Sequence, residues 1–156
     1  MERSLLIDDF LMKAGWVGAT RGLLAGDASF RRYERIKIKE KTAIFMDAPP
    51  LKEGVRSFIK MTEHLIKLGY SVPRIFATDI NSGFLLLEDF GDATFTNALA
   101  SGVNEKQLYQ SAIDVLIDLH GRELSKVVPD DLVNYDEEKL FTEVTLFVDW
   151  YIGGIF

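Results

Sequence analysis

Residues 71–92 read SVPRIFATDINSGFLLLEDFGD, and this stretch contains the signals that decide the fold. Pro73 precedes a short run with strand character, Arg74–Thr78, and a second apolar run follows at Phe84–Glu88. Between them, Asn81-Ser82-Gly83 is typical of a tight turn, so the two runs predict a β-hairpin. The four residues after this hairpin, Asp89–Asp92, lead into sequence with helical periodicity, so the chain changes there from strands to helices.

Upstream of the hairpin, the hydrophobic pattern predicts a helix, three strands and a second helix. Residues 4–14 repeat apolar side chains at helical spacing, whereas residues 20–48 alternate in the manner of strands, with a turn near Gly26-Asp27. Residues 53–68 return to helical spacing and end at Gly69, a typical residue after a helix. Together with the hairpin, these elements predict a small, largely antiparallel sheet with one helix laid across it.

Downstream of Asp92 the pattern is entirely helical. A capping box of Asn104 with Gln107 predicts the start of a helix that runs to His120, and Asp136 predicts the start of a last helix. The side chains expected on the buried side of that last helix are Leu140, Val144, Phe147, Val148 and Tyr151, and the aromatic residues expected mainly in the core are Phe141, Phe147, Trp150, Tyr151 and Phe156. The fold class is therefore α+β, with a sheet-bearing part at 1–90 and a helical part at 92–156.

Composition narrows the class of protein. The chain has 156 residues, of which 47% are hydrophobic and 27% charged, and a net charge of −6, which disfavours nucleic-acid binding. There is no cysteine, which excludes disulfides and thiolate chemistry and fits a reducing cytoplasm. Asp8 and Asp9 interrupt the N-terminal apolar run, and no run is long enough for a membrane span, so we expect a cytoplasmic protein without a membrane partner.

Several segments resemble one family in their order and spacing. LAGDASFRRYERI (24–36), AIFMDAPP (43–50), the stretch 71–92, VLIDLH (115–120) and LFVDWYI (146–152) are similar to the aminoglycoside phosphotransferase and choline kinase-like superfamily. They look most similar to its bacterial branch of anomeric N-acetylmuramate/N-acetylglucosamine kinases. The resemblance implies a protein-kinase-like N-lobe followed by the first helices of a C-lobe. It also implies a phosphotransferase that uses ATP with Mg²⁺ on an amino sugar in cell-wall recycling.

The resemblance places a nucleotide site at two segments. In the family the glycine turn, here Gly26, Asp27, Ala28 and Ser29, covers the nucleotide phosphates, and an ordinary hairpin turn is the alternative. The linker between the lobes, here Glu88–Phe90 in a hinge at 88–91, contacts the purine edge through its main chain, with Phe84–Leu87 as an apolar wall. Asp89-Phe90-Gly91 matches the magnesium-binding tripeptide of protein kinases, but no catalytic loop precedes it, so we interpret Asp89 as a hinge residue.

The residues expected to neutralise the charge of the phosphates match the kinase pattern only in part. Kinase-like folds pair a strand lysine with a helix carboxylate, and Met46 stands near the lysine position while Glu63 stands at the carboxylate position. Arg31 or Arg32, on the strand that leaves the glycine turn, is the candidate substitute for the lysine. For Glu63 the alternative is a solvated helix position.

The family's catalytic loop, His-x-Asp with an asparagine a few residues on, and its later metal-binding aspartate are not found in residues 1–156. We therefore expect a truncated, N-terminal portion of a sugar kinase that binds nucleotide but lacks catalytic and metal residues. The alternative is a non-catalytic nucleotide-binding or protein-interaction module, similar to a pseudokinase. A second chain, or self-association through the last helix, is a candidate partner, and Glu143 and Asp149 are candidates for contact with the amino sugar.

Overall fold

The computed structural model describes residues 2–24, 29–129 and 132–155, and its contacts divide the chain into two compact units, Met1–Ile113 and Asp114–Phe156. Each unit is described by itself. The predicted residues Gly26, Asp27, Ala28 and Phe156 lie outside the described residues. The predicted boundary at residues 88–91 is a change from sheet to helices, and its assignment to two lobes remains a prediction.

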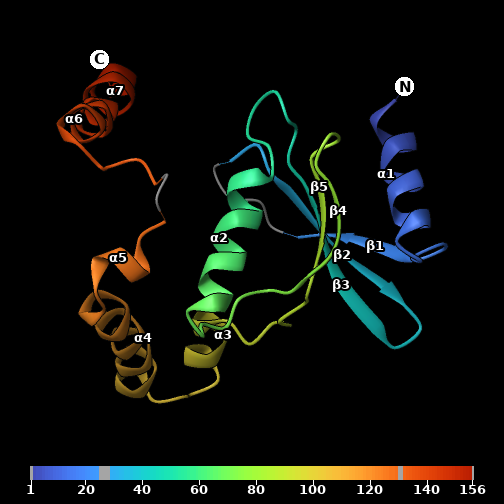
Figure 1. The fold of residues 1–156 in the computed structure, drawn as a ribbon, viewed down its shortest axis with the longest axis horizontal. Coiled ribbons are helices and arrows are strands. Elements are labelled where there is room, and N and C mark those ends of the chain that lie inside the picture. The colour runs from blue at the N-terminus through green and yellow to red at the C-terminus, as the bar shows by residue number, and fades with distance from the viewer. Residues whose placement is uncertain (1, 25–28, 130–131, 156) are drawn as a thin grey trace. The chain divides into compact units, whose positions relative to one another are not determined.

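The first unit is built on a five-stranded sheet with the order β1-β2-β3-β5-β4, in which every neighbouring pair is antiparallel (Figure 1). The strands are β1 (Thr20–Leu23), β2 (Arg32–Ile38), β3 (Lys41–Asp47), β4 (Ile75–Asp79) and β5 (Phe84–Leu87). The predicted succession of helix, three strands, helix and two strands is confirmed, and so is the α+β fold class. This is the arrangement of a kinase-like N-lobe.

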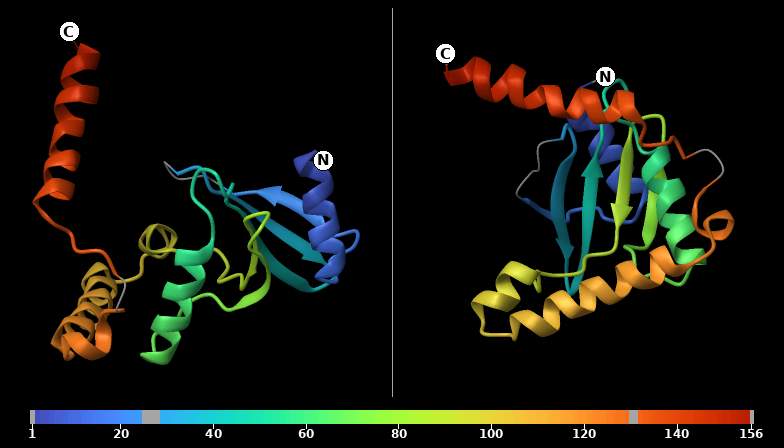
Figure 2. Two further views of the ribbon diagram at one scale, coloured as in Figure 1. Left: turned by 45° about the horizontal axis from the view of Figure 1, so that its top comes forward. Right: turned by 90° about the vertical axis from the view of Figure 1, so that its left-hand side faces the viewer.

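Helix α1 (Arg3–Lys13) and helix α2 (Arg56–Lys67) lie on opposite sides of the sheet (Figure 2). The core under α1 is aromatic, because the rings of Phe10, Phe45 and Phe84 lie with their centroids 5.4–5.9 Å apart. The core under α2 consists of Met46, Ala48, Val55, Leu85 and Leu87, with Phe58 and Ile59 packed against it. Since side chains alternate along a strand, even-numbered residues of β2 face α1 and odd-numbered residues face α2.

The turn between β4 and β5 contains the glycine that the sequence predicts. The Ser82 N–H donates to Asp79 Oδ1 over 3.0 Å, and Gly83 adopts a φ of 74°. A Cβ at Gly83 would lie 2.0 Å from the carbonyl oxygen of Ala48, whose N–H donates to the Gly83 carbonyl over 2.8 Å. The turn therefore requires glycine both for its backbone angle and for its close approach to the segment after β3.

As predicted, Gly69 follows the end of α2 as its C′ residue, and it has a φ of 89°. The Gly69 N–H donates to the Ile66 carbonyl over 2.9 Å and the Tyr70 N–H donates to the Leu65 carbonyl over 3.0 Å, which is the Schellman arrangement. Within the described residues, the chain then returns along the sheet to begin β4.

Helices follow the sheet. They are α3 (Phe95–Ala100), α4 (Glu105–Gly121), α5 (Leu124–Val127), α6 (Glu137–Leu146), the π-helical segment η1 (Phe147–Ile152) and α7 (Gly153–Ile155). Asn104 Oδ1 accepts from the Gln107 N–H and Asp136 Oδ1 accepts from the Lys139 N–H, each over 3.0 Å, so both predicted N-caps are confirmed. The short helices α3 and α5 are elements for which the sequence analysis predicts no separate helix.

The prediction of a buried side on the last helix is wrong for the described residues. None of the side chains described from Asp114 onward is buried, and Val144, Phe147 and Tyr151 are 58–67% exposed. The expected core aromatics Phe141 and Trp150 are 71% and 78% exposed. An apolar helix face is buried only where another element packs on it, and the described part of this unit supplies none. No helix of the described chain is long and apolar enough to cross a bilayer.

Candidate functional site

A cavity of about 310 Å³ lies on the α2 side of the sheet, next to the segment that follows β5. Its lining residues are Leu24, Tyr33, Arg35, Ile44, Phe58, Pro73, Leu87, Glu88, Asp89, Phe90 and Gly91. The structure thus brings the predicted hinge residues Leu87, Glu88, Asp89 and Phe90 together with β2, β3 and the last described residue before the glycine turn. Cavities that bind small molecules typically measure about 300–1,000 Å³, so this one is large enough for part of a nucleotide, such as its base.

The predicted apolar wall at Phe84–Leu87 is only partly correct. Leu87 lines the cavity, but Phe84 and Leu86 belong to the core under α1 on the other face of the sheet. Consecutive strand residues point to opposite faces, so four successive residues cannot form one wall. Ile44 of β3 and Tyr33 of β2 supply the apolar and aromatic surface instead.

The main chain of the hinge is partly engaged. The Glu88 N–H donates to the Arg74 carbonyl over 2.8 Å, and Arg74 Nη2 donates to the Glu88 carboxylate over 3.0 Å. These hydrogen bonds from Arg74 hold the pKa of Glu88 below its ordinary value. The Gly91 N–H donates to Asp89 Oδ1 over 2.9 Å, whereas the Phe90 N–H has no partner among the described residues. Phe90 therefore retains a main-chain donor beside the cavity.

The Asp89 carboxylate is an internal acceptor. It receives the Gly91 N–H, the Thr42 side chain and Arg35 Nη2, the last over 3.0 Å, and only 6% of the side chain is exposed. Burial alone would raise the pKa of Asp89, but these hydrogen bonds and the nearby guanidinium together lower it. These contacts support the interpretation of Asp89 as a hinge residue, because they occupy the carboxylate that a metal ligand would present.

Arg35 and Asp92 are site residues that the sequence reasoning missed. Arg35 Nη1 donates to Asp92 Oδ1 over 2.8 Å, and Arg35 Nε lies 2.8 Å from Asp89 Oδ2 in an ion pair that lacks hydrogen-bond alignment. Asp89 and Asp92 lie 54 and 57 residues after Arg35 in the sequence. The only sequence signal for Arg35 is its place in the alternating pattern of residues 20–48, which does not reveal its partners.

Met46 and Glu63 lie outside the cavity lining. Met46 is fully buried on the α2 side of β3 and packs with Val55 and Leu85, so its thioether fills the core where a kinase-like lysine would stand. Glu63 is exposed on α2 and forms no ion pair with the described residues. This position favours the solvated alternative for Glu63.

The arginines and the serine next to the glycine turn have distinct positions. Arg32 is exposed, and the alternation of β2 places it on the α1 side, away from the cavity. Arg31 Nε lies 2.8 Å from Glu53 Oε2, and its guanidinium lies 6.0 Å from the ring centroid of Phe58, a cavity-lining residue. Ser29 Oγ accepts from the Arg31 N–H over 3.1 Å. Arg31 is therefore the arginine nearer to the cavity lining.

The candidates for an amino-sugar contact lie in the second unit. Glu143 is exposed on α6 and accepts a hydrogen bond from the Tyr135 hydroxyl, which raises the pKa of Tyr135. Asp149 is exposed within η1. Their role toward a sugar remains a prediction.

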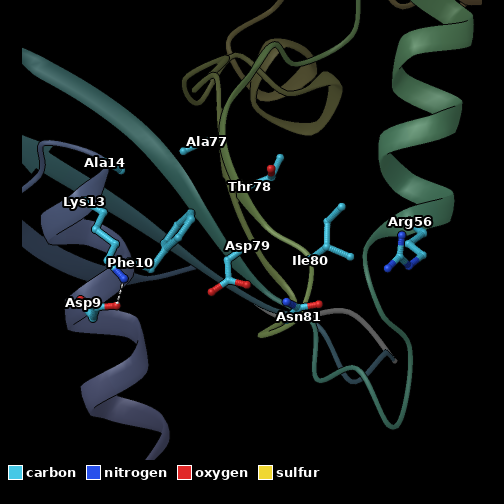
Figure 3. A pocket seen from close by; sticks show the side chains of 10 residues that line it. All are labelled: Asp9, Phe10, Lys13, Ala14, Arg56, Ala77, Thr78, Asp79, Ile80 and Asn81. Carbon is cyan, nitrogen blue, oxygen red and sulfur yellow. Dashed lines mark hydrogen bonds and ion pairs between the residues drawn. The ribbon is translucent and has the colours of Figure 1, made fainter.

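A second cavity, of about 620 Å³, lies between α1 and β4 and contains none of the predicted site residues (Figure 3). Its charged side chains are mostly engaged with one another or with the main chain. Lys13 Nζ lies 2.6 Å from Asp9 Oδ2, and Asp79 accepts from Ser82. Figure 3 shows Arg56 apart from this group, at the start of α2. The cavity has no set of convergent, uncommitted groups.

Comparison with known proteins identifies the family. Residues 21–151 match the model of the phosphotransferase enzyme family, which is most of the chain. This chain belongs to the phosphotransferase enzyme family. The match includes β2–β5, all of β1 except its first residue, and the residues that line the cavity, so the family predicted from the sequence motifs is confirmed.

The curated relatives of this family member include three sugar kinases. The chain is 41% identical over 129 residues to the N-acetylmuramate/N-acetylglucosamine kinase of Pseudomonas aeruginosa, 34% over 150 residues to that of Pseudomonas putida and 32% over 181 residues to that of Caulobacter vibrioides. These matches cover 83%, 94% and 96% of this chain but only 37%, 43% and 50% of the relatives. The chain thus spans half or less of the length of these relatives.

Proposed function

We propose that this chain carries the nucleotide-binding part of an ATP-dependent sugar kinase. The observation that carries the proposal is the cavity in which residues 87–91 meet the α2 side of the sheet. Membership of the phosphotransferase family and the names of the relatives support phosphoryl transfer from ATP to N-acetylmuramate or N-acetylglucosamine.

The purine occupies the cavity in this proposal. Ile44 and Leu87 offer apolar surface to one face of the base, and the rings of Tyr33 and Phe58 lie in the same lining. The free N–H of Phe90 is the donor for a ring nitrogen at the purine edge. Such a combination of apolar walls with a few placed polar groups is typical of small-molecule sites.

The phosphates extend toward Ser29 and Arg31 in this proposal. Both lie at or just after the end of the predicted glycine turn, and Arg31 stands on the cavity side of β2. Arg31 is therefore the proposed substitute for the strand lysine, because Arg32 lies on the other face. Met46 contributes packing rather than charge.

A Mg²⁺ site in this part of the chain would have to be formed by the described carboxylates or histidines. None of them forms a group of three that is placed to hold a metal ion, and the Asp89 carboxylate is already engaged. No described residue is therefore assigned to Mg²⁺, and no step is derived through it. Mg²⁺ as the companion of ATP rests on the family alone.

The direct test is thermal unfolding of the chain with and without ATP, ADP and GTP, together with the variants Phe90→Pro and Phe90→Ala. Proline removes the main-chain donor, whereas alanine keeps it and removes only the exposed ring. We expect adenine nucleotides to stabilise the wild-type chain by about 2.7 kcal/mol at a hundredfold excess over Kd. Phe90→Pro should abolish most of this effect and Phe90→Ala should keep it.

Absence of any nucleotide effect on the wild type would reject this proposal and favour a protein-interaction module. Turnover of N-acetylmuramate and N-acetylglucosamine with ATP distinguishes an active kinase from a nucleotide-binding module. Binding without turnover would support the cavity assignment and reject catalysis by the chain as tested.

A further inference from the structure

The cavity lining contains a single cation, Arg35, and this inference about its role rests on the proposed function. A guanidinium beside a nucleotide site either binds a phosphate or holds protein groups in place. The two roles require different partners, because a phosphate ligand must keep donors free, whereas a positioning residue spends them on the protein.

Both terminal nitrogens of Arg35 donate to protein carboxylates, whereas Nε has no aligned hydrogen-bond partner among the described residues. Nη2 donates to Asp89 Oδ1 over 3.0 Å and Nη1 donates to both oxygens of Asp92 over 2.8 and 2.9 Å. Nε faces Asp89 Oδ2 at 2.8 Å. One positive charge thus lies between two carboxylates, so the cluster keeps a net negative charge that disfavours an adjacent phosphate.

The partners of Arg35 hold both ends of the segment that carries Phe90. Asp89 Oδ1 also accepts the Gly91 N–H over 2.9 Å, and the Asp92 carbonyl accepts the Thr94 N–H over 2.8 Å. Arg35 itself is anchored in the middle of β2, opposite Ile44 of β3. A residue in the sheet therefore sets the conformation of the segment on which the free Phe90 N–H depends.

We propose that Arg35 is the positioning residue of the purine site, which acts through Asp89 and Asp92 to hold the hinge main chain and thereby sets the preference for adenine. It binds no phosphate. The preference for adenine then depends on an ion-pair cluster that does not itself contact the base. If the cluster is lost, the Phe90 N–H is misplaced and no longer distinguishes adenine from hypoxanthine.

The test compares binding of ADP, inosine diphosphate and inorganic tripolyphosphate to the wild-type chain, Arg35→Met and Arg35→Lys. Lysine keeps the charge but cannot bridge two carboxylates with fixed geometry. The matched control is Arg21→Met, which removes an arginine of similar exposure that pairs with Glu34 on the α1 side of the same sheet. Affinities are measured by calorimetry and referred to the folded fraction from circular dichroism.

We expect both Arg35 variants to lose about tenfold or more in ADP affinity, which corresponds to the loss of a charged hydrogen bond. Their ADP to inosine diphosphate ratio should fall toward one, while tripolyphosphate binding and the Arg21→Met variant stay unchanged. Asp92→Asn, at an exposed carboxylate, should reproduce part of the effect if Arg35→Met does not fold.

Two results would overturn the inference while the proposed function stands. One is an unchanged ratio and affinity in the Arg35 variants, and the other is a parallel loss of ADP and tripolyphosphate binding, which identifies a phosphate ligand. Failure of the wild type to bind any adenine nucleotide would instead reject the proposed function, and the inference with it.

Discussion

At the scale of single residues, Asp89 illustrates how surroundings decide the role of a short motif. The tripeptide Asp89-Phe90-Gly91 has the letters of a metal-binding motif, yet its carboxylate faces Arg35, Thr42 and the Gly91 N–H. These partners fix the Asp89 carboxylate within the segment that follows β5. The same contacts determine how its charge affects stability.

The contacts of Asp89 predict that its contribution to the stability of the fold depends on pH. Its pKa is lowered from 3.8 in the folded protein, so its ionised form stabilises the fold fully above that value, and this contribution is lost as the pH falls through the lowered pKa. We expect Asp89→Asn to cost about 1–3 kcal/mol at pH 7 and progressively less below about pH 4. Urea unfolding of both proteins between pH 3 and 7 measures the difference, and a constant difference would contradict the prediction.

We expect the carboxylate of Asp47, on the α1 side of the sheet, to contribute strongly to the free energy of unfolding. This side chain is 7% exposed and accepts from Arg3 Nε over 3.1 Å, while Arg3 Nη2 also donates to the Ser82 carbonyl over 3.0 Å. Asp47→Ala should reduce the free energy of unfolding by about 1–3 kcal/mol, because it removes the hydrogen-bonded ion pair between α1 and β3.

The control for Asp47 is Lys13→Met, which removes an exposed pair with Asp9 on the same helix. Its effect should stay within about 0.5 kcal/mol. Equal losses in the two variants, measured by urea unfolding, would show that the Arg3–Asp47 contact adds no more than a surface pair.

At the scale of elements, the alternation of side chains along each strand decides which residues face the cavity and which face α1. In β2 it places Tyr33 and Arg35 toward the cavity and Glu34 and Ile36 toward α1. The same rule moves Arg32 away from the cavity and leaves Leu87 as the member of Phe84–Leu87 that lines it. Tight turns keep this register.

Gly83 predicts how strongly one such turn depends on glycine. Gly83→Ala should cost at least about 2 kcal/mol, since it adds both a positive-φ penalty and a clash with the main chain of Ala48, 2.0 Å from the new Cβ. Gly69→Ala is the matched control, because Gly69 also has positive φ but open space around it, and should cost about 1 kcal/mol. Thermal unfolding followed by circular dichroism checks both, and equal shifts would contradict the role of the contact.

At the scale of the whole molecule, the two units differ in packing. The first contains every buried side chain among the described residues, whereas the second contains none. Local stability follows burial, so the units should differ in how often their backbone hydrogen bonds open.

Hydrogen exchange detects this difference. Amides of β3 and β5 should be the most protected of the chain, and amides of α6 should exchange faster by several orders of magnitude, since none of the described side chains of α6 is buried. Mass spectrometry of peptides from the labelled chain measures both. Comparable protection of the two segments would show that α6 is covered in solution.

Local patterns were sufficient for much of this structure. The order of the elements, the end of α2 before Gly69, the caps at Asn104 and Asp136 and the turn at Gly83 all depend on neighbours within a few residues. The resemblance of residues 71–92 also indicated the segment that borders the cavity, whereas its role as a hinge stays a prediction. Whether the last helix is buried could not be predicted, because the apolar face of a helix does not show which element packs against it.

The amino-acid sequence by itself determined the α+β succession of elements, the family and the segment that borders the cavity, since periodicity, turn residues and motif spacing are local properties. Only the tertiary structure decided that Arg35 joins Asp89 and Asp92, that Arg32 and Glu63 stand away from the cavity, and that Met46 is buried. These assignments depend on strand register and on contacts between residues more than fifty positions apart. Such contacts bring charged side chains together, and no local sequence pattern predicts them.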